Sequence, residues 1–268
     1  MLFLIFINDI VDNIVNPINL FADDTSLYVI VNDPSESASA LQIDIDTIES
    51  WSHDWLVNFN PSKSQNLLMS RKRKPQTHPN LNMSGTIIKS VTSHKHLGLT
   101  FASDASWSEH ITNTKEKAWS RINIMRRLKF KLDRKTLEVI YISFIRPLLE
   151  YADVIWDNCS QNDKYELDKI QYEAARIVTG CTKLVSINRL ISEVGWASLS
   201  DRRRDHKLIL FYKMQNGLTP QYLSNIIPRN ENPLYNLRNA SDATGVFSRT
   251  SNYFYLLRSG SGTLCPTK

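Results

Sequence analysis

The first hundred residues alternate between short apolar runs and polar breaks, a pattern typical of strands joined by turns. Residues 18–21 and 26–31 are rich in β-forming side chains, and Ala22-Asp23-Asp24-Thr25 lies between them. Two such runs around a polar tetrapeptide predict a β-hairpin with both aspartates at its tip. Residues 2–15 are apolar enough for a buried helix, which Pro17 would prevent from extending.

A longer helical pattern follows this hairpin. Apolar residues recur at steps of three and four, which marks one face of a helix of about five turns. These residues are Leu41, Ile45, Ile48, Trp51 and Trp55. Asp33 or Ser35 is a suitable N-cap, with Glu36 in the first turn, and Asn60-Pro61 ends the segment.

Shorter strands come next, and the character of the chain changes near residue 104. Residues 65–70, 87–91 and 96–101 are predicted strands, and the polar residues 71–85 are predicted to form an exposed loop. After residue 104, apolar stripes predict four helices, of which the last covers residues 201–215. The first three stripes are Ile111, Ala118, Ile122 and Met125; Leu137, Ile140 or Tyr141, Phe144 and Leu148, ending near Pro147; and Leu167, Ile170, Ala174 and Ile177.

This order of elements predicts an α+β fold for the first part of the chain and a helical remainder, with a boundary near residues 101–107. The 268 residues include 42% hydrophobic and 22% charged side chains, so a folded core is expected. Cys159, Cys181 and Cys265 lie far apart, which excludes a disulfide scaffold, predicts no disulfide partner and fits a reducing, intracellular compartment. No apolar run approaches the roughly 20 residues of a membrane span, so no membrane partner is expected.

Charge is distributed unevenly along the chain. The net charge is +5, yet residues 1–60 contain ten acidic residues and no Lys or Arg, so residues 61–268 carry +15. The acids are suited to bind cations and the bases to bind a polyanion, although a solvated, unevenly charged surface is the simpler alternative.

Asp23 and Asp24 are the sharpest candidate for chemistry. Two adjacent carboxylates repel each other unless a cation neutralises them, and no Lys or Arg lies in residues 1–60. Hard oxygen ligands favour Mg²⁺ or Mn²⁺, which serve phosphoryl transfer in two-metal sites. The structural alternative is an Asp-Asp turn whose side chains bind local backbone N–H groups.

The segments around these aspartates resemble the palm of non-LTR retrotransposon reverse transcriptases of the jockey-like LINE group. Residues 2–10, LFLIFINDI, are similar to the family's FLIYIND, and residues 20–28, LFADDTSLY, contain its FADDT hairpin. Residues 51–64 are similar to its W…W…LNPSKT segment, and residues 94–101, HKHLGLTF, to FKYLGVTL. Residues 107–111 and 145–151 resemble its thumb.

The resemblance implies a function and a role for each matching residue. The function is RNA-directed DNA polymerisation with Mg²⁺ or Mn²⁺, deoxynucleotides, an RNA template and a DNA primer or hybrid duplex. Asp23 and Asp24 would be metal-binding and catalytic, and Lys63 would be a catalytic residue near the triphosphate, as proton donor to pyrophosphate. His96, Leu97 and Gly98 would position the primer. The implied regions are a partial palm over residues 1–103, a helical thumb-like region over 104–180, and a helical connection with a poorly ordered tail over 181–268.

Departures from the family pattern predict an inactive chain. The family's first catalytic aspartate and its PQG template-gripping segment lie upstream of FLIYIND, where this chain starts, and its SF…WN.LP pattern does not follow Tyr253. The alternative is a non-catalytic nucleic-acid-binding remnant of a transposon. In either case the chain is expected in the nucleus or cytoplasm. A two-metal nuclease is disfavoured because no HxxE or DxE carboxylate set accompanies Asp23.

The missing upstream strand also predicts aggregation. Leu4, Phe6 and the 41–55 helix would pack on a sheet that is left partly uncovered, which exposes apolar surface to water.

Basic residues are dense in one segment. Residues 121–135 contain seven, and the thumb resemblance implies that they follow the backbone of the template–primer duplex. They are Arg121, Arg126, Arg127, Lys129, Lys131, Arg134 and Lys135. Arg71-Lys72-Arg73-Lys74 suits an exposed loop better than a nuclear import site, and Arg202-Arg203-Arg204 is a weaker candidate because Asp201 and Asp205 flank it.

Overall fold

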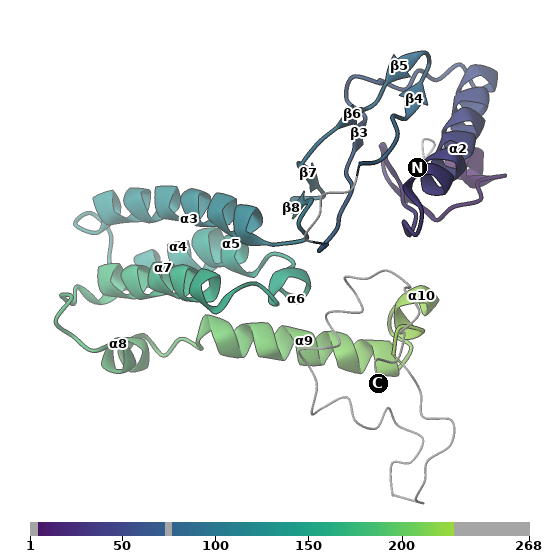
Figure 1. Cartoon of the computed structure of the whole chain (residues 1–268). Helices are drawn as coiled ribbons and strands as arrows, with labels where there is room; N and C mark the ends of the chain where they lie inside the picture. The colour runs from purple at the N-terminus through teal and green to yellow at the C-terminus, as the bar shows by residue number, and fades with distance from the viewer. Residues whose placement is uncertain (1–4, 73–76, 228–268) are drawn as a thin grey trace, which may run out of the picture. The chain divides into compact units, whose positions relative to one another are not determined.

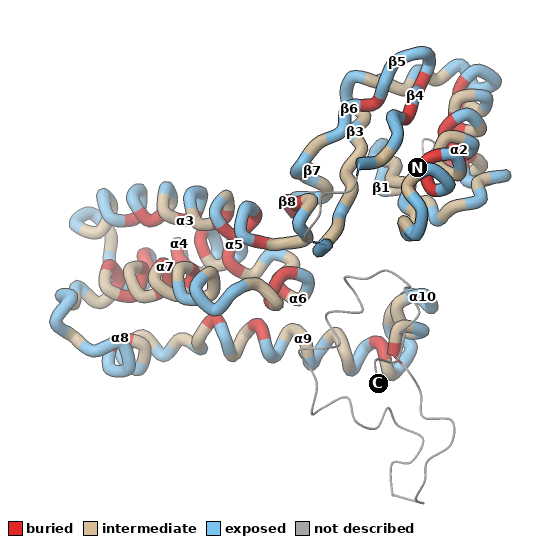
Figure 2. Tube along the Cα trace, viewed as in Figure 1, coloured by how far each residue is buried: buried red, intermediate tan, exposed pale blue. Residues whose placement is uncertain are grey.

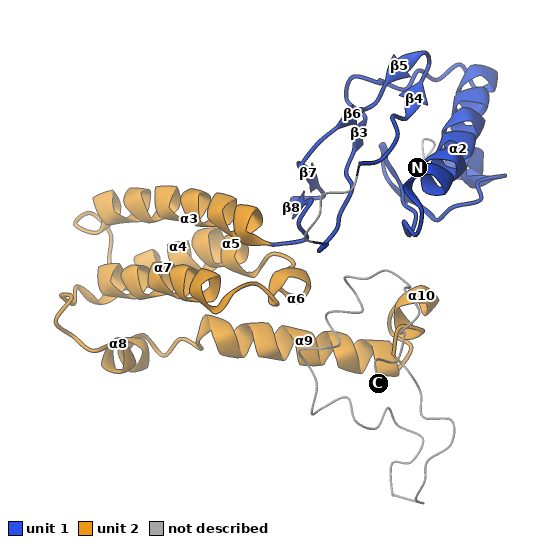
Figure 3. Cartoon of the chain, viewed as in Figure 1, with its two compact units in different colours: residues 1–106 blue, residues 107–268 orange. Residues whose placement is uncertain are grey.

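A computed structural model describes residues 5–72 and 77–227 (Figure 1). The chain divides into two compact units, residues 1–106 and residues 107–268 (Figure 3). The first unit combines helices with small, mostly antiparallel sheets, and the described part of the second is helical. This arrangement confirms the α+β class predicted from the sequence. Within the described residues, no helix is both long enough and apolar enough to cross a bilayer.

The predicted hairpin and the helix after it are both present in the first unit. Strands β1 (Ile18–Phe21) and β2 (Asp24–Leu27) pair antiparallel. Helix α2 (Pro34–Asp54) begins at Asp33, whose carboxylate accepts hydrogen bonds from the backbone N–H groups of Ser35 and Glu36. The prediction of one helix over residues 2–15 is wrong in its described part. There residues 5 and 6 are α-helical, a 3-10 helix (Asn8–Val11) follows, and a turn at residues 12–13 ends the helical segment; residues 2–4 lie outside the described residues.

The remaining predicted strands are wrong in their extent, because 65–70 shortens to two residues and 87–91 and 96–101 are each divided between two strands. Strand β3 (Gln65–Asn66) pairs in parallel with β6 (Lys89–Ser90), and β7 (Ser93–His96) pairs antiparallel with β8 (Leu99–Ala102). The prediction that residues 71–85 form only an exposed loop is wrong. The hairpin of β4 (Asn82–Met83) and β5 (Thr86–Ile87) begins there, and residues 73–76 lie outside the described residues.

Two small apolar clusters form the core of the first unit. Ala38 and Ile45 of α2 pack with Leu81, Met83 and Ile88, so the loop predicted to be exposed contributes core side chains. Ile48 packs with Ile7 and Ile10, and Trp51 and Leu27 lie against them. At the end of α2 the predicted apolar stripe is only partly buried, because Trp55 is 45% exposed.

The second unit contains α3 (Ser108–Leu128), α4 (Arg134–Ile140), α5 (Arg146–Glu150), α6 (Asp153–Trp156), α7 (Gln161–Thr179), α8 (Ile187–Val194), α9 (Leu199–Gln215) and α10 (Gln221–Ser224). The predicted stripes of α3 and α7 are buried throughout, and the two helices pack on each other (Figure 2). The sequence did not predict α6, α8 and α10, which are short. Gly180, with φ of +72°, ends α7 in the left-handed conformation that favours glycine.

The second predicted stripe is wrong beyond Tyr141. A π-helical turn (Tyr141–Ile145) joins α4 to α5, and the Arg146 N–H donates to the Tyr141 carbonyl, five residues back. The wider turn rotates the following residues, so Ile145 and Leu149 are buried while Phe144 is 45% exposed. Because the extra residue relaxes the backbone hydrogen-bonding pattern there, Pro147 lies in the first turn of α5 rather than ending the helix.

Candidate catalytic hairpins and basic surface

The Asp23–Asp24 hairpin has a two-residue turn. Phe21 pairs with Asp24, which leaves Ala22 and Asp23 as the loop. Ala22 has φ of +52°, a left-handed conformation that is strained for a residue with a side chain. Asp23 therefore lies in the loop and Asp24 is the first residue of β2, and both side chains are exposed. A strained turn at an exposed pair of carboxylates is the kind of local conformation that functional sites often contain.

Asp44 of α2 anchors the segment that leads into this hairpin. Its carboxylate is fully buried and accepts three hydrogen bonds, from the Val15 N–H at 2.9 Å, the Asn16 N–H at 3.0 Å and the Asn16 side-chain amide at 2.7 Å. Asp44 is one of the ten acids of residues 1–60, and its buried, hydrogen-bonded carboxylate is not open to a cation. It instead fixes the chain just before β1.

A second tight hairpin lies beside the first. Leu97 and Gly98 form the two-residue loop between β7 and β8, and both have positive φ, +46° and +84°. This is the backbone of a type I′ turn, which suits glycine at the second position but strains Leu97. His96 Nε2 lies 3.5 Å from the Ser26 hydroxyl of β2. The residues predicted to hold the primer and those predicted to hold metal thus belong to neighbouring hairpins.

His94 joins these hairpins to a third segment, and sequence analysis did not assign it a role. Its Nδ1 lies 2.7 Å from Gln65 Oε1 in β3, and its ring stacks on His96 with centroids 6.3 Å apart. Burial, with the charge of His96, lowers the pKa of His94, and the Asp24 carboxylate opposes this shift. The sequence clue was the spacing of His94 and His96, which places both on one face of a strand.

Lys63 lies in the turn two residues before Gln65. Its backbone N–H donates to the Asn60 carbonyl, and its side chain is exposed. The described part of the chain shows no contact between the Lys63 side chain and Asp23 or Asp24. The turn is shaped by Asn60, whose side-chain oxygen accepts from the Ser62 N–H and hydroxyl.

The two exposed aspartates fit part of a divalent-cation site. Among the described residues, neither side chain has a hydrogen bond or ion pair that would occupy its oxygens, whereas Asp9, Asp33 and Asp44 are engaged within the protein. No three His, Cys, Asp or Glu side chains of the described residues converge on one point. Mg²⁺ commonly uses one or two protein carboxylates and takes its other ligands from water and substrate phosphates, so the pair suits that ion.

The basic segment 121–135 divides into paired and unpaired side chains. Arg121 lies over the Phe144 ring and donates to the Phe144 carbonyl, Arg126 pairs with Glu173 at 2.8 Å, and Arg134 pairs with Glu193 at 2.9 Å. Within the part of the chain described here, the other four have no ion pair. These unpaired bases are Arg127, Lys129, Lys131 and Lys135.

Phe130 stands among these unpaired bases and was not singled out from the sequence. It is 86% exposed, and Lys129 Nζ lies 4.8 Å from the centre of its ring. Exposed aromatic rings next to cations provide stacking surfaces for nucleotide bases. The four unpaired bases with Phe130 are called the basic surface below.

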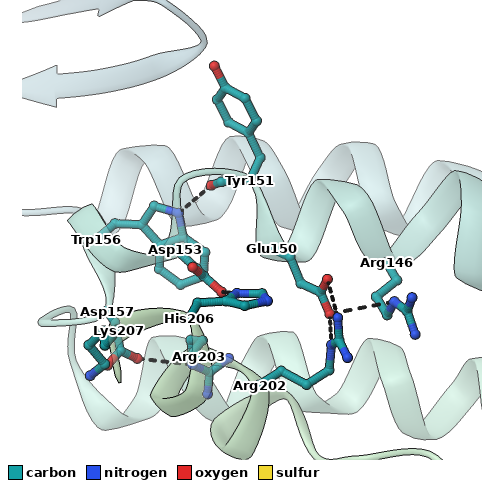
Figure 4. Close-up of polar contacts among 10 residues, drawn as sticks. All are labelled: Arg146, Glu150, Tyr151, Asp153, Trp156, Asp157, Arg202, Arg203, His206 and Lys207. Atoms are coloured by element: carbon teal, nitrogen blue, oxygen red, sulfur yellow. Dashed lines mark hydrogen bonds and ion pairs between the residues drawn. The ribbon is translucent and has the colours of Figure 1, made fainter. Parts of the chain in front are cut away.

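Arg202 and Arg203 are not exposed bases but members of a polar network between helices (Figure 4). Arg202 pairs with Glu150 and Arg203 with Asp157, while His206 Nδ1 lies 2.7 Å from Asp153 Oδ2. Burial raises the pKa of Asp153, and the hydrogen bond from His206 opposes this shift. Arg204 alone of the three arginines faces water, where it pairs with Asp201 and Asp205. Of the run at 71–74, Arg71 and Lys72 are exposed, and the other two lie outside the described residues.

Replacing Ala22 with glycine should stabilise the first unit by about 0.5–1 kcal/mol, because glycine relieves the left-handed strain at a smaller entropic cost. Chemical denaturation of the Ala22→Gly variant measures the change. Ala40→Gly, in helix α2, is the matched control and should destabilise by about 1 kcal/mol. Equal losses in both variants would show that the turn is not strained.

The chain is similar to RNA-directed DNA polymerases of Drosophila melanogaster transposable elements. It is 26% identical over 208 residues to the probable RNA-directed DNA polymerase from transposon BS, a match covering 71% of this chain and 22% of that protein. Over 191 residues it is 24% identical to the probable RNA-directed DNA polymerase from transposon X-element, covering 69% of this chain and 21% of that one. Over 163 residues it is 24% identical to the RNA-directed DNA polymerase from mobile element jockey, a match covering 60% of this chain and 18% of that protein.

These matches confirm the resemblance to non-LTR retrotransposon reverse transcriptases that the motifs indicated. The chain spans about a fifth of the length of these curated relatives. No protein-family model matches the chain, and no solved structure does.

Proposed function

We propose that this chain is the palm-and-thumb part of a non-LTR retrotransposon reverse transcriptase, with residues 1–103 as partial palm, 104–180 as a thumb-like region and 181–268 as a connection. The observation that carries the proposal is the neighbouring position of two strained hairpins. One presents Asp23 and Asp24 without partners among the described residues, and the other presents Leu97 and Gly98 beside it. Similarity to three polymerases over most of the chain supports the same assignment.

In this proposal the two hairpins bind the reacting groups of a nucleotidyl transfer. Divalent cations, when bound, supply the positive charge that stabilises the phosphoryl group in an in-line displacement. Asp23 and Asp24 hold those cations, and the His96–Gly98 turn positions the 3′ end of a DNA primer on an RNA template. Lys63, on an exposed turn, contacts the triphosphate of the incoming deoxynucleotide. The basic surface of the second unit follows the backbone of the hybrid duplex.

The metal-binding part of the proposal is tested by adding Mn²⁺ and following paramagnetic broadening of amide resonances. Residues of the β1–β2 hairpin should broaden first in the parent, and this broadening should disappear when Asp23 and Asp24 are both changed to Asn. Asp54→Asn is the matched control, because Asp54 is an exposed acid at the end of α2. Broadening that survives the double substitution would contradict the assignment.

We further propose that the 268-residue chain does not polymerise by itself. Two adjacent carboxylates cannot bridge two cations and also the nucleotide, and the described residues bring no third carboxylate to them. Primer extension on an RNA template, with Mg²⁺ and deoxynucleotides, should therefore give no product. Incorporation that depends on Asp23 would overturn this proposal. A chain that binds duplex but not Mn²⁺ would favour the alternative, a non-catalytic transposon remnant.

A further inference from the structure

The inner face of α9 is ionic rather than apolar. Four bases at spacings of one and four residues lie on one face of the helix, and they meet acids from α5 and the segment through α6 (Figure 4). The bases are Arg202, Arg203, His206 and Lys207, and the acids are Glu150, Asp153 and Asp157. We call these two sets the basic stripe and the acidic face. The Arg203 side chain is only 3% exposed, so the contact excludes water at its centre.

The apolar residues in the middle of α9 lie on its other side. Leu208, Ile209 and Tyr212 are 39%, 52% and 61% exposed. Met214, near the end of the helix, is buried with Ile227 and is packed by Leu223, so it joins α9 to the α10 region rather than to the acidic face. A surface helix normally turns its apolar face inward, and α9 does so near its ends, where Leu199 and Met214 are buried, but its buried residue between them is Arg203. Charge pairing therefore supplies most of the contact in the middle of α9.

The charge pairing is incomplete, which limits how strongly it holds the helix. Arg203 Nε lies 3.0 Å from Asp157 Oδ1, but neither this N–H nor Nη1 is aligned for a hydrogen bond within the described residues. Asp157 is shared among Arg203, Lys207 and Lys164. Desolvation of buried ions offsets most of their mutual attraction, so such a contact adds little net free energy. When α9 separates, both charged sets regain water. Asp157 keeps its ion pair with Lys164, whereas Asp168 of α7 loses its 3.8 Å pair with Arg203.

We propose that α9 is a releasable arm whose basic stripe binds a nucleic-acid phosphate backbone once it leaves the acidic face. In the structure, carboxylates of the acidic face pair with the basic stripe. Phosphate oxygens are equivalent bidentate acceptors, so they could replace these carboxylates at Arg202 and Arg203. The choice of nucleic acid as the polyanion rests on the proposed function. The arm thus adds a second, concealed phosphate-binding surface to the exposed one at residues 127–135.

Neutralising the acids and neutralising the bases should have the same effect on the release of α9 but different effects on duplex affinity. The two variants therefore test release and phosphate binding separately. In the acid-side variant, Glu150→Gln, Asp153→Asn and Asp157→Asn free the basic stripe. In the base-side variant, Arg202→Gln, Arg203→Gln and Lys207→Gln free α9 but remove the stripe's charge. Both should lose amide protection in α9 during hydrogen–deuterium exchange, while α3 and α7 stay protected. Only the acid-side variant should bind a short RNA–DNA hybrid duplex more tightly than the parent, by about tenfold at low salt.

Arg204→Gln is the control, since this arginine faces water, and it should change neither α9 protection nor affinity by a comparable amount. A second measurement uses the unmodified chain, in which rising NaCl should expose α9 amides before those of α3. Unchanged α9 protection in both variants would overturn the release, and equal affinities of the two variants would overturn phosphate binding by the stripe. Duplex binding by the acid-side variant but not by the parent would support the arm and count against the proposed exposed surface.

Discussion

Reversing the four unpaired bases of the basic surface is expected to lower the affinity for an RNA–DNA hybrid duplex by about a hundredfold or more at low salt. Arg127, Lys129, Lys131 and Lys135, each changed to Glu, replace four counterion-releasing contacts with four repulsive charges. The dependence of affinity on salt should also become shallower, because its slope follows the number of phosphates that are neutralised. Fluorescence anisotropy of a labelled duplex across a salt series measures both effects.

Two control variants make this result specific. Arg126→Gln removes a base that is already paired with Glu173, so its effect should be much smaller than that of any one unpaired base. Changing both Asp23 and Asp24 to Asn should leave binding unchanged or slightly tighter, because it removes two like charges near the phosphate backbone. If the reversed variant binds as well as the parent, the segment is only a solvated surface, and the thumb proposal loses its support.

Replacing Asp44 with alanine is expected to destabilise the first unit by about 3 kcal/mol. The substitution removes a buried acceptor of three hydrogen bonds and leaves the N–H groups of Val15 and Asn16 without that partner. Since these residues lead into β1, the hairpin that presents Asp23 should also lose order. Urea denaturation gives the free energy, and amide exchange of residues 18–27 reports on the hairpin.

Asp46→Ala provides the comparison for Asp44→Ala, because Asp46 is exposed on the same helix and, within residues 5–72 and 77–227, accepts a side-chain hydrogen bond from Gln42 alone. Its effect should stay within about 0.5 kcal/mol, as for most surface substitutions. Similar losses in the two variants would mean that the Asp44 carboxylate does not anchor the hairpin.

Local patterns predicted the long elements well. The hairpin, α2, α3, α7 and α9 were all expected. The hairpin, α2, α3 and α7 each combine a clear apolar pattern with a turn or cap residue, and Gly217 and Pro220 marked the end of α9. The β4–β5 hairpin was missed because its strands have only two residues each and Leu81 and Met83 stand in a polar stretch. The π-helical turn was missed because a single extra residue changes the phase of a stripe without changing its composition.

The candidate site could be predicted only as separate motifs. Nothing in the sequence indicates that Ser26 meets His96 or that Gln65 meets His94, because contacts across about 70 and 30 positions depend on the whole unit. Charge alone could not distinguish unpaired Arg127 from Arg126, which is paired with Glu173, or buried Arg203 from exposed Arg204. Acidic partners distant in sequence decide which arginines are free to bind a ligand. The apolar stripes predicted the helices but not which helices pack together, so these partners could not be predicted.

Three hairpins of the first unit turn through only two residues each: Ala22-Asp23, Ser84-Gly85 and Leu97-Gly98. A two-residue loop is the shortest that commonly joins two antiparallel strands, so its length is constrained as strictly as its composition. One residue inserted after Ala22 would either enlarge the loop or slide β2 along β1, and a slide by one position moves every side chain to the opposite face. Substitutions can accumulate around Asp23 while the hairpin survives, but a single-codon insertion there would be expected to disable it at once.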